Sequence, residues 1–289
     1  MIEIFRSFIV GGIQGVSEFL PISSSGHLVL IPYLFKWNYN GLAFDVALHF
    51  GTLVAIIAYF WSDWKSIIAN AIGKPDVIAR SEATKQSSGT NTQIATPTAR
   101  NDTMQYPKNL LWQLLVATIP AAVVGLLIQG SVESRLHSPL LIAGNLIFFG
   151  LILWLIDRYS ESDKKMINIS HGKSFLIGVV QSISLMPGVS RSGITMTAAR
   201  SLGLDRESAA RFSFLLAAPA MLGAFLLETK DINSSSLDIS FLVGVIASAI
   251  FGFIAIKYLL QYLKKGSFVI FLWYRILIAA IVLSIYFTR

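Results

Sequence analysis

The sequence contains no cysteine, and charged residues are scarce in it. Without cysteine the chain has no disulfide framework, no thiol nucleophile and no cysteine ligands for an iron–sulfur cluster. Only 13% of its 289 residues are charged, whereas soluble domains carry about 25%. The scarcity of charge therefore argues against a soluble protein.

Hydrophobic residues take the place of charge. They make up 54% of the chain, and the mean hydropathy is +0.64. This composition predicts an all-α integral membrane protein with residues 1–289 in a single membrane domain. The net charge of +7 indicates membrane topology and attraction to anionic lipid headgroups. Nucleic acid is not expected as a partner, because the basic residues flank apolar stretches.

Six stretches are apolar enough over about 20 residues to cross a bilayer as transmembrane helices. They lie near residues 42–61, 109–130, 138–157, 208–229, 239–261 and 268–287. Two further apolar segments, 1–36 and 172–202, are interrupted by proline, serine and glycine, and neither half of either segment reaches a spanning length. We therefore predict two re-entrant helix-loop-helix hairpins, whose irregular backbone must be buried in protein or line a cavity.

Two other stretches bear on the organisation of the chain. The segment from about 74 to 105 is rich in serine and threonine and poor in large apolar residues. It cannot bury enough surface to order itself, so we expect a disordered cytoplasmic insertion there, with a regulatory or partner-binding role left open. No removable signal peptide is expected, because Gln14 and Glu18 interrupt the first apolar run.

The two interrupted segments are similar to each other. Both carry a glutamine, then a proline, then a Ser-x-Ser-Gly tetrapeptide at closely matching offsets: Gln14, Pro21 and 23–26, and Gln181, Pro187 and 190–193. They divide the chain into repeats at 1–157 and 172–289, each a hairpin followed by three spans. Because three is odd, the second repeat must lie inverted relative to the first, and inverted repeats place a site at their interface. Chance similarity of two loops is the alternative.

Basic residues predict the orientation of the chain in the membrane. They gather in the loops at 65–108, 158–173 and 264–265, whereas the opposite loops carry few. Cytoplasmic loops are enriched in lysine and arginine, so the first set of loops is assigned to the cytoplasm. On this map the first hairpin opens toward the exterior, and the second enters from the cytoplasm.

The first hairpin carries groups that can perform chemistry. Gln14 and Glu18 are four residues apart and share one helix face. Ser24 could attack phosphorus once a base removes its proton, and His27 is close enough in sequence to be that base or the nucleophile itself. Glu18 could orient His27, or it could hold a divalent cation together with Gln14.

The second hairpin places Arg191 between the hydroxyls of Ser190 and Ser192 at membrane depth. An arginine there is costly and needs a carboxylate, carbonyls or an anionic ligand. Its planar fork suits phosphate oxygens, and helices that restart after such loops direct N–H groups to the same place. Two hairpins that meet at their tips would form a phosphoryl-transfer site, with Arg191 and the hydroxyls stabilising the equatorial oxygens.

Each of these groups also has a structural interpretation. Glu18 and Arg191 could form a salt bridge that only joins the two halves, and His27 could be a satisfied interfacial histidine. Serines in membrane helices usually bond backbone carbonyls. Asp45 and His49, four residues apart in the first span, could line the site or lie behind it. The convergence of acid, imidazole, hydroxyls and cation on two meeting segments favours the chemical interpretation.

Both loops resemble the motifs of one family. Residues 14–27 resemble the [Glu/Gln]-x-x-x-Glu and Pro-x-Ser-Ser-x-Gly-His motif of the undecaprenyl-diphosphate phosphatases, the bacitracin-resistance family. Residues 187–195 resemble the second motif of that family, Pro-Gly-x-Ser-Arg-Ser-x-x-Thr. The likeness extends over nearly the whole chain and includes residues 209–215 and the pair Tyr274–Arg275.

The resemblance implies an activity and a set of site residues. The chain would remove the terminal phosphate from a C55 isoprenoid diphosphate and regenerate the monophosphate carrier of cell-wall synthesis, which confers bacitracin resistance. Carried over by motif position, the catalytic residues are Glu18, Ser24, His27 and Arg191. The substrate-binding candidates are Gln14, Ser23, Ser25, Ser190, Ser192 and Thr195. The motif leaves open whether Ser24 or His27 attacks phosphorus.

The resemblance also implies a cofactor, partners and a location. A divalent cation, Mg or Ca, is expected, with Glu18 and Gln14 as candidate ligands. The expected partners are a polyprenyl diphosphate lipid and the membrane, and the chain could also form a homodimer. The expected location is the bacterial inner membrane, with the active site open to the periplasmic or exterior side. Gln14 departs from members with glutamate there, which weakens a two-carboxylate metal site, and the 74–105 insertion is not a family feature.

A transporter or flippase of the polyprenyl-phosphate carrier is the alternative function. This alternative rests on the inverted repeats, because they are a common transporter architecture. A transporter has no need for a hydroxyl beside an imidazole, and this favours the enzyme. A purely structural membrane protein would leave Glu18 and Arg191 at membrane depth unexplained.

Overall fold

The computed structural model describes residues 1–37, 41–73, 106–128, 138–160, 164–228 and 238–288. Over these residues the secondary structure is helical, apart from an isolated bridge between Lys164 and Leu204. The α-helices are α1 (Ile2–Phe19), α2 (Ser24–Phe35), α3 (Leu42–Tyr59), α4 (Trp61–Ala71), α6 (Leu110–Ile128), α7 (Pro139–Tyr159), α8 (His171–Gln181), α9 (Arg191–Ser201), α10 (Arg206–Glu228), α11 (Ile239–Leu263) and α12 (Val269–Thr288). Two short 3-10 helices, η1 (Met166–Asn168) and η2 (Ser182–Leu185), flank α8. The expected insertion at about 74–105 lies outside the described residues.

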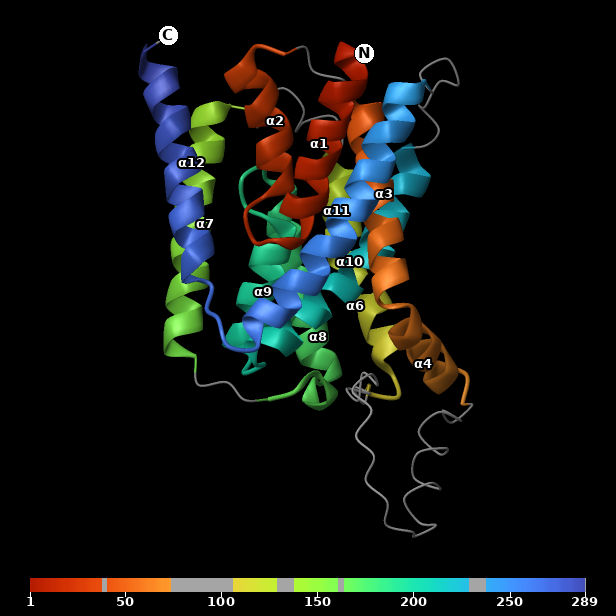
Figure 1. Cartoon of the computed structure of the whole chain (residues 1–289). Helices are drawn as coiled ribbons and strands as arrows, with labels where there is room; N and C mark the ends of the chain where they lie inside the picture. The colour runs from red at the N-terminus through yellow and green to blue at the C-terminus, as the bar shows by residue number, and fades with distance from the viewer. Residues whose placement is uncertain (38–40, 74–105, 129–137, 161–163, 229–237, 289) are drawn as a thin grey trace, which may run out of the picture.

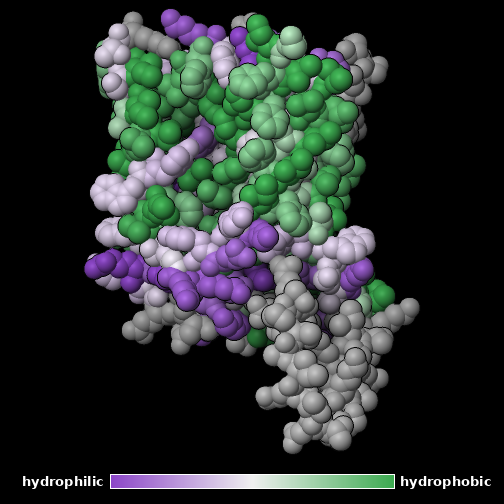
Figure 2. All heavy atoms as spheres, viewed as in Figure 1, coloured by the Kyte–Doolittle hydropathy of each residue, from purple (hydrophilic) through white to green (hydrophobic). Residues whose placement is uncertain are grey.

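Five helices of the described chain are long and apolar enough to cross a membrane, namely α6, α7, α10, α11 and α12. The α3 helix meets the same standard only together with α4, to which it is bent by 75°. These helices agree with the six predicted stretches to within a few residues, but α4 was not predicted. Hydrophobic atoms form a broad belt above a hydrophilic lower rim (Figure 2). The prediction of an all-helical integral membrane protein is confirmed.

The two interrupted segments form helix pairs that enter the bundle from opposite ends. In Figure 1, α1 and α2 occupy the upper half of the molecule, and α8 and α9 lie in the lower half. Their tips meet in the middle, where the Ser192 hydroxyl donates to the Leu20 carbonyl at 3.1 Å. Each pair turns back before crossing the bundle, so the tips lie deep within it.

The local sequence explains why each pair turns where it does. Leu20, which precedes Pro21, has the extended conformation that residues before proline favour. Ser23 and Ser190 each precede the second helix of a pair, and both have positive φ angles, 73° and 75°, which are uncommon for residues other than glycine. Their hydroxyls accept the N–H groups of Gly26 at 3.3 Å and Gly193 at 3.1 Å. The two tips therefore share one backbone geometry and one N-cap.

Glycines allow α1 to lie unusually close to α11. A Cβ atom at Gly11 would collide with the carbonyl oxygen of Gly244, and one at Gly15 would lie 2.5 Å from the carbonyl oxygen of Ser248. Gln14 and Glu18 lie on the same side of α1 as Gly11 and Gly15, because residues three and four positions apart share one helix face. This close approach holds the functional end of α1 in place.

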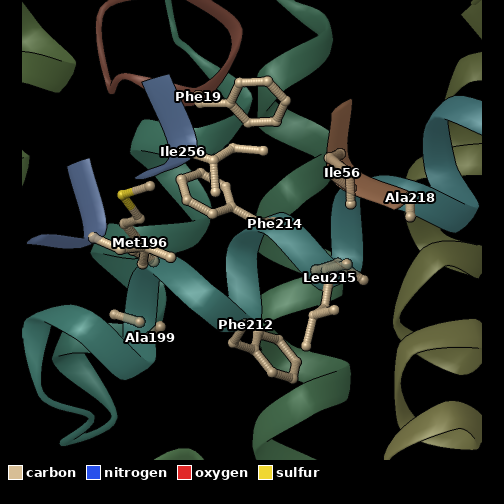
Figure 3. Packing of buried hydrophobic residues seen from close by; sticks show 14 of the residues in the cluster. Phe19, Ile56, Met196, Ala199, Phe212, Phe214, Leu215, Ala218 and Ile256 are labelled. Atoms are coloured by element: carbon tan, nitrogen blue, oxygen red, sulfur yellow. The ribbon is translucent and has the colours of Figure 1, made fainter. Parts of the chain in front are cut away.

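The largest hydrophobic core packs around α10, next to the hairpin tips. Phe19, at the end of α1, meets Phe214 of α10 edge to face, with the ring centroids 5.3 Å apart. Figure 3 shows these rings packed among Ile56 of α3, Met196 of α9 and Ile256 of α11. Side chains from both hairpins thus share one core with α3, α10 and α11.

A buried carboxylate anchors the far end of α9. Asp157 of α7 lies 3.0 Å from the Arg200 guanidinium of α9 and 2.8 Å from that of Arg206 of α10. Its second oxygen accepts the N–H of Phe268, just before α12, at 3.3 Å. Arg191 is the first residue of the same helix, so this cluster fixes the end of α9 opposite to Arg191.

Candidate active site

An ion pair joins the two hairpin tips. The Arg191 guanidinium donates through Nη2 to Oε1 of Glu18, so a side chain of α9 pairs with one of α1. Both groups are largely buried, with 16% and 5% of their side chains exposed. The same Nη2 lies 3.4 Å from the Met221 sulfur of α10. Arg191 Nη1 is buried without a hydrogen-bond partner among the described residues, which leaves a donor for a ligand.

The Ser24 hydroxyl points at the same carboxylate. Its Oγ donates to Oε2 of Glu18 at 2.5 Å, and the Gln14 amide donates to that oxygen at 3.0 Å. Ser24 is the first residue of α2 and is half-buried, whereas Gln14 and Glu18 are buried. A hydroxyl in contact with an acceptor carboxylate is the arrangement in which a base activates a nucleophile.

His49 of α3 also faces this carboxylate. Its Nε2 lies 3.6 Å from Glu18 Oε2, and its Nδ1 donates to the Asp45 carbonyl at 2.7 Å. The sequence left open whether His49 lines the site, because the rotation of α3 against α1 is a tertiary property. The structure places the ring beside Glu18, with 36% of the side chain exposed.

His27 points toward Tyr274 and not toward Glu18. Its Nδ1 donates to the Ser23 carbonyl at 2.7 Å, because a carbonyl can only accept. Its Nε2 then accepts from the Tyr274 hydroxyl at 2.8 Å, and the two rings are stacked with centroids 5.7 Å apart. The structure therefore orients His27 through Ser23 and Tyr274. A contact between Glu18 and His27, which was one of the two roles considered for Glu18, is not among the hydrogen bonds of the described residues.

Most of the other predicted hydroxyls serve the loops themselves. Ser23 and Ser190 are N-caps, Ser25 lies 3.4 Å from Ser23, and Ser192 lies 3.2 Å from Ser190. Thr195 is fully buried; it donates to the Arg191 carbonyl at 2.8 Å, and its Oγ1 lies 2.6 Å from Ser213 Oγ of α10. Ser24 and Ser25 are half-buried, so they are more accessible than the caps.

Arg275 of α12 bridges both loops from behind. It is 1% exposed, and it donates from Nε to the Pro21 carbonyl at 2.6 Å and from Nη2 to the Val189 carbonyl at 3.3 Å. Asn145 of α7 adds a bond to the Pro187 carbonyl at 2.8 Å. No site role was predicted for Arg275, although a cation in the middle of an apolar span was the signal.

A cavity of about 300 Å³ lies on the other side of α1. Its walls are mostly apolar and come from α1, the first loop, α2, α11 and α12: Phe8, Ile9, Gly12, Ile13, Val16, Ser17, Ile22, His27, Phe251 and Tyr274. Gly12 and Val16 occupy a different face of α1 from Gln14 and Glu18. The cavity therefore reaches the first hairpin tip from the side opposite the carboxylate.

The residues present do not suit a cation held by the protein alone. Both oxygens of Glu18 accept hydrogen bonds, Gln14 directs its amide N–H at one of them, and Arg191 brings a positive charge to the other. No group of three or more His, Cys, Asp or Glu side chains in the described ranges could hold a metal ion. A cation here would have to take most of its ligands from water and a bound phosphate.

The tips nevertheless favour an anion. The helices α2 and α9 begin at Ser24 and Arg191 and run in opposite directions away from the contact (Figure 1). Each N-terminus carries partial positive charge and backbone N–H groups that its own helix does not use. Together with the Arg191 guanidinium, they form a site suited to a phosphate group next to the Ser24 hydroxyl.

The sequence is similar to proteins of one family. The family model described as "Bacitracin resistance protein BacA" matches residues 7–281. A protein from Moorella thermoacetica named undecaprenyl-diphosphatase is 41% identical over 286 residues, which is 99% of each chain. One of that name from Pelotomaculum thermopropionicum is 44% identical over 283 residues, 97% of each chain, and one from Desulforudis audaxviator is 42% identical over 288 residues, 99% of this chain and 98% of the relative. This chain belongs to the bacitracin resistance protein BacA family.

Proposed function

We infer that this chain hydrolyses undecaprenyl diphosphate to undecaprenyl phosphate and inorganic phosphate. This reaction recycles the lipid carrier for cell-wall synthesis and confers bacitracin resistance. The named relatives support the activity over nearly the full chain. The observation that carries the chemistry is the Ser24 hydroxyl bonded to Glu18, with Arg191 supplied by the other hairpin.

The geometry supports a two-step displacement. Ser24 Oγ attacks the terminal phosphorus while its proton passes to Glu18 Oε2, and the bond to the bridging oxygen breaks to release undecaprenyl phosphate. Water then attacks the phosphoserine, which releases inorganic phosphate and restores the hydroxyl. Arg191 and the N-termini of α2 and α9 stabilise the equatorial oxygens in both steps. His27 is a weaker candidate nucleophile, because its Nε2 lone pair already accepts from Tyr274.

The same proposal includes a membrane arrangement. Six spans, with α3 as the first, carry two re-entrant hairpins in inverted repeats at 1–157 and 172–289. The matched caps at Ser23 and Ser190 support the repeat. The distribution of basic residues supports an inner-membrane orientation with the site open to the exterior. Exposed apolar faces on α6, α11 and α12 would accommodate lipid or the second copy of a homodimer.

We also propose that the divalent cation, Mg or Ca, arrives with the substrate. Diphosphate oxygens would supply most of its ligands, as they do for Mg in many phosphoryl-transfer sites. The cation would neutralise charge on the diphosphate, while Glu18 and Gln14 keep the contacts described above. This assignment follows from the ion pair of Glu18 with Arg191, which already occupies that carboxylate.

Purified protein in detergent is expected to release inorganic phosphate from C55 diphosphate. Chelation should lower the rate by about 100-fold or more, because charge neutralisation by a metal contributes several kcal/mol, and added Mg or Ca should restore it. A parallel assay in liposomes should follow movement of the lipid. Movement without phosphate release would favour a transporter and contradict the enzyme.

The cavity beside His27 is the proposed position of the isoprenoid chain. Its walls are mostly apolar, it lies within the span of α1, and two of its lining residues, Ile22 and His27, flank Ser23 and Ser24 in the sequence. Ile13→Trp should therefore raise KM for the C55 substrate by about tenfold, since overfilling a packed space costs about 1–3 kcal/mol. A C15 diphosphate, which is too short to depend on the whole cavity, should be hydrolysed almost as well as by the wild type.

Ile119→Trp provides the matched control for this substitution. Ile119 lies on α6 with 53% of its surface exposed, away from the cavity. Kinetic constants for both substrates should stay near the wild-type values in this variant. An equal effect of Ile13→Trp on C15 and C55 diphosphates would contradict the assignment of the cavity to the lipid tail.

A further inference from the structure

His49 is an ionisable side chain of the site, and it lies outside both sequence motifs. Its Nε2 lies 3.6 Å from Oε2 of Glu18, the oxygen that also accepts from Ser24. This separation is too long for a hydrogen bond in the resting site, but such contacts commonly shorten when substrate binds. The ring is held in place, because Nδ1 donates to the Asp45 carbonyl at 2.7 Å.

That anchor determines what the other ring nitrogen can do. Because Nδ1 carries the proton in the neutral ring, Nε2 presents a lone pair to Glu18. An ionised Glu18 gains little from a lone pair, whereas a Glu18 that has just taken the Ser24 proton can donate to it. The contact is therefore stronger after proton transfer than before, which is the property that raises kcat.

The other groups around Glu18 do not duplicate this role. Arg191 of α9 contacts Oε1, and Gln14 of α1 directs an N–H, not an acceptor, at Oε2. From α10 the Met221 sulfur lies against Arg191. His27 is engaged with Ser23 and Tyr274. His49 is thus the described side chain whose acceptor nitrogen faces the base.

We propose that His49 is a positioning residue that stabilises the protonated carboxyl of Glu18 formed when Ser24 attacks. The proposal rests on the proposed function, since it assigns the support of the base in that reaction. It adds a residue of α3 to a site otherwise built from the two hairpins. His49 itself makes no contact with the substrate in this scheme, so its effect should appear in kcat and not in KM.

Two amide substitutions of His49 distinguish the roles of its two ring nitrogens. His49→Asn can replace the donor at Nδ1 but is too short to reach Glu18, whereas His49→Gln extends an amide to the position of Nε2. We expect His49→Asn to lower kcat for phosphate release about 10-fold with KM unchanged, because a hydrogen bond made only after proton transfer is lost. His49→Gln should stay within about threefold of the wild type.

Controls distinguish this effect from loss of fold and from failure of the enzyme assignment. His171→Asn, at the exposed start of α8, should leave kcat unchanged. Thermal unfolding in detergent should be similar for the two His49 variants, so unequal activity is not a stability effect. In a Ser24→Ala background, His49→Asn should cause no further loss. Equal kcat in the Asn and Gln variants, or a change confined to KM, would overturn the proposal, while an inactive wild type would instead contradict the proposed function.

Discussion

Replacing Ser24 by alanine is expected to lower kcat for phosphate release by about 10⁴-fold or more. The Ser24 hydroxyl is the group that contacts the Glu18 carboxylate at 2.5 Å, and no neighbouring hydroxyl shares that contact in the described residues. Ser23 and Ser190 are used as caps, and Ser192 donates to the Leu20 carbonyl. Single-turnover assays with radiolabelled C55 diphosphate, with a search for phosphoserine after acid quench, would measure both the rate and the intermediate.

The comparison with His27 decides which group attacks phosphorus. If Ser24 is the nucleophile, Ser24→Ala loses the phosphoenzyme and His27→Ala retains it at a reduced rate. If His27 is the nucleophile, label appears on histidine, and Ser24→Ala keeps much of its activity. Ser201→Ala, at the exposed end of α9, removes a hydroxyl away from the site and should behave as the wild type.

The helical organisation could be predicted from the sequence because it depends on local signals. Runs of about 20 apolar residues mark spans, and a proline followed by serines and glycine marks a turn, whatever the tertiary structure. The bend between α3 and α4 had no such signal. No proline or glycine lies between Tyr59 and Trp61. After the 75° bend α4 buries Ile67, while its other residues stay partly or fully exposed.

The composition of the site was less predictable than the location of its loops. The four-residue spacing placed Gln14 and Glu18 on one face, and the loop chemistry brought Ser24 and Arg191 to the tips; all four are in contact in the structure. The direction of an imidazole depends on its neighbours across the fold. Tyr274, which is far from His27 in the sequence, forms the hydrogen bond that orients the His27 ring.

Long-range pairing also explains the residues that were underestimated. His49 and Arg275 lie in apolar helices, where the sequence indicates that a polar group needs a partner but not which one. The structure shows the partners: Glu18 faces His49, and the Pro21 and Val189 carbonyls accept hydrogen bonds from Arg275. Each of these contacts joins segments far apart in the chain, so no local pattern could predict it.

Arg191→Ala is expected to lower kcat/KM by about 10³- to 10⁵-fold, the range found when an arginine that stabilises a transferring phosphoryl group is removed. The guanidinium is pre-positioned by Glu18 and keeps Nη1 available for a ligand. Arg191→Lys should recover only part of the loss, because an ammonium cannot contact two phosphate oxygens in a fixed fork. Phosphate release measured across a range of substrate concentrations would separate the effects on kcat and KM.

The double variant Glu18→Gln/Arg191→Met tests whether this ion pair only joins the two halves of the protein. Removing Arg191 alone leaves Glu18 buried and unpaired, which costs about 3–5 kcal/mol, so lost activity could reflect lost structure. The neutral pair removes that charge, and its thermal stability in detergent should return close to the wild-type value. A structural salt bridge would then predict restored activity. We expect the double variant to stay inactive, because it lacks both the base that accepts the Ser24 proton and the cation that binds the phosphate.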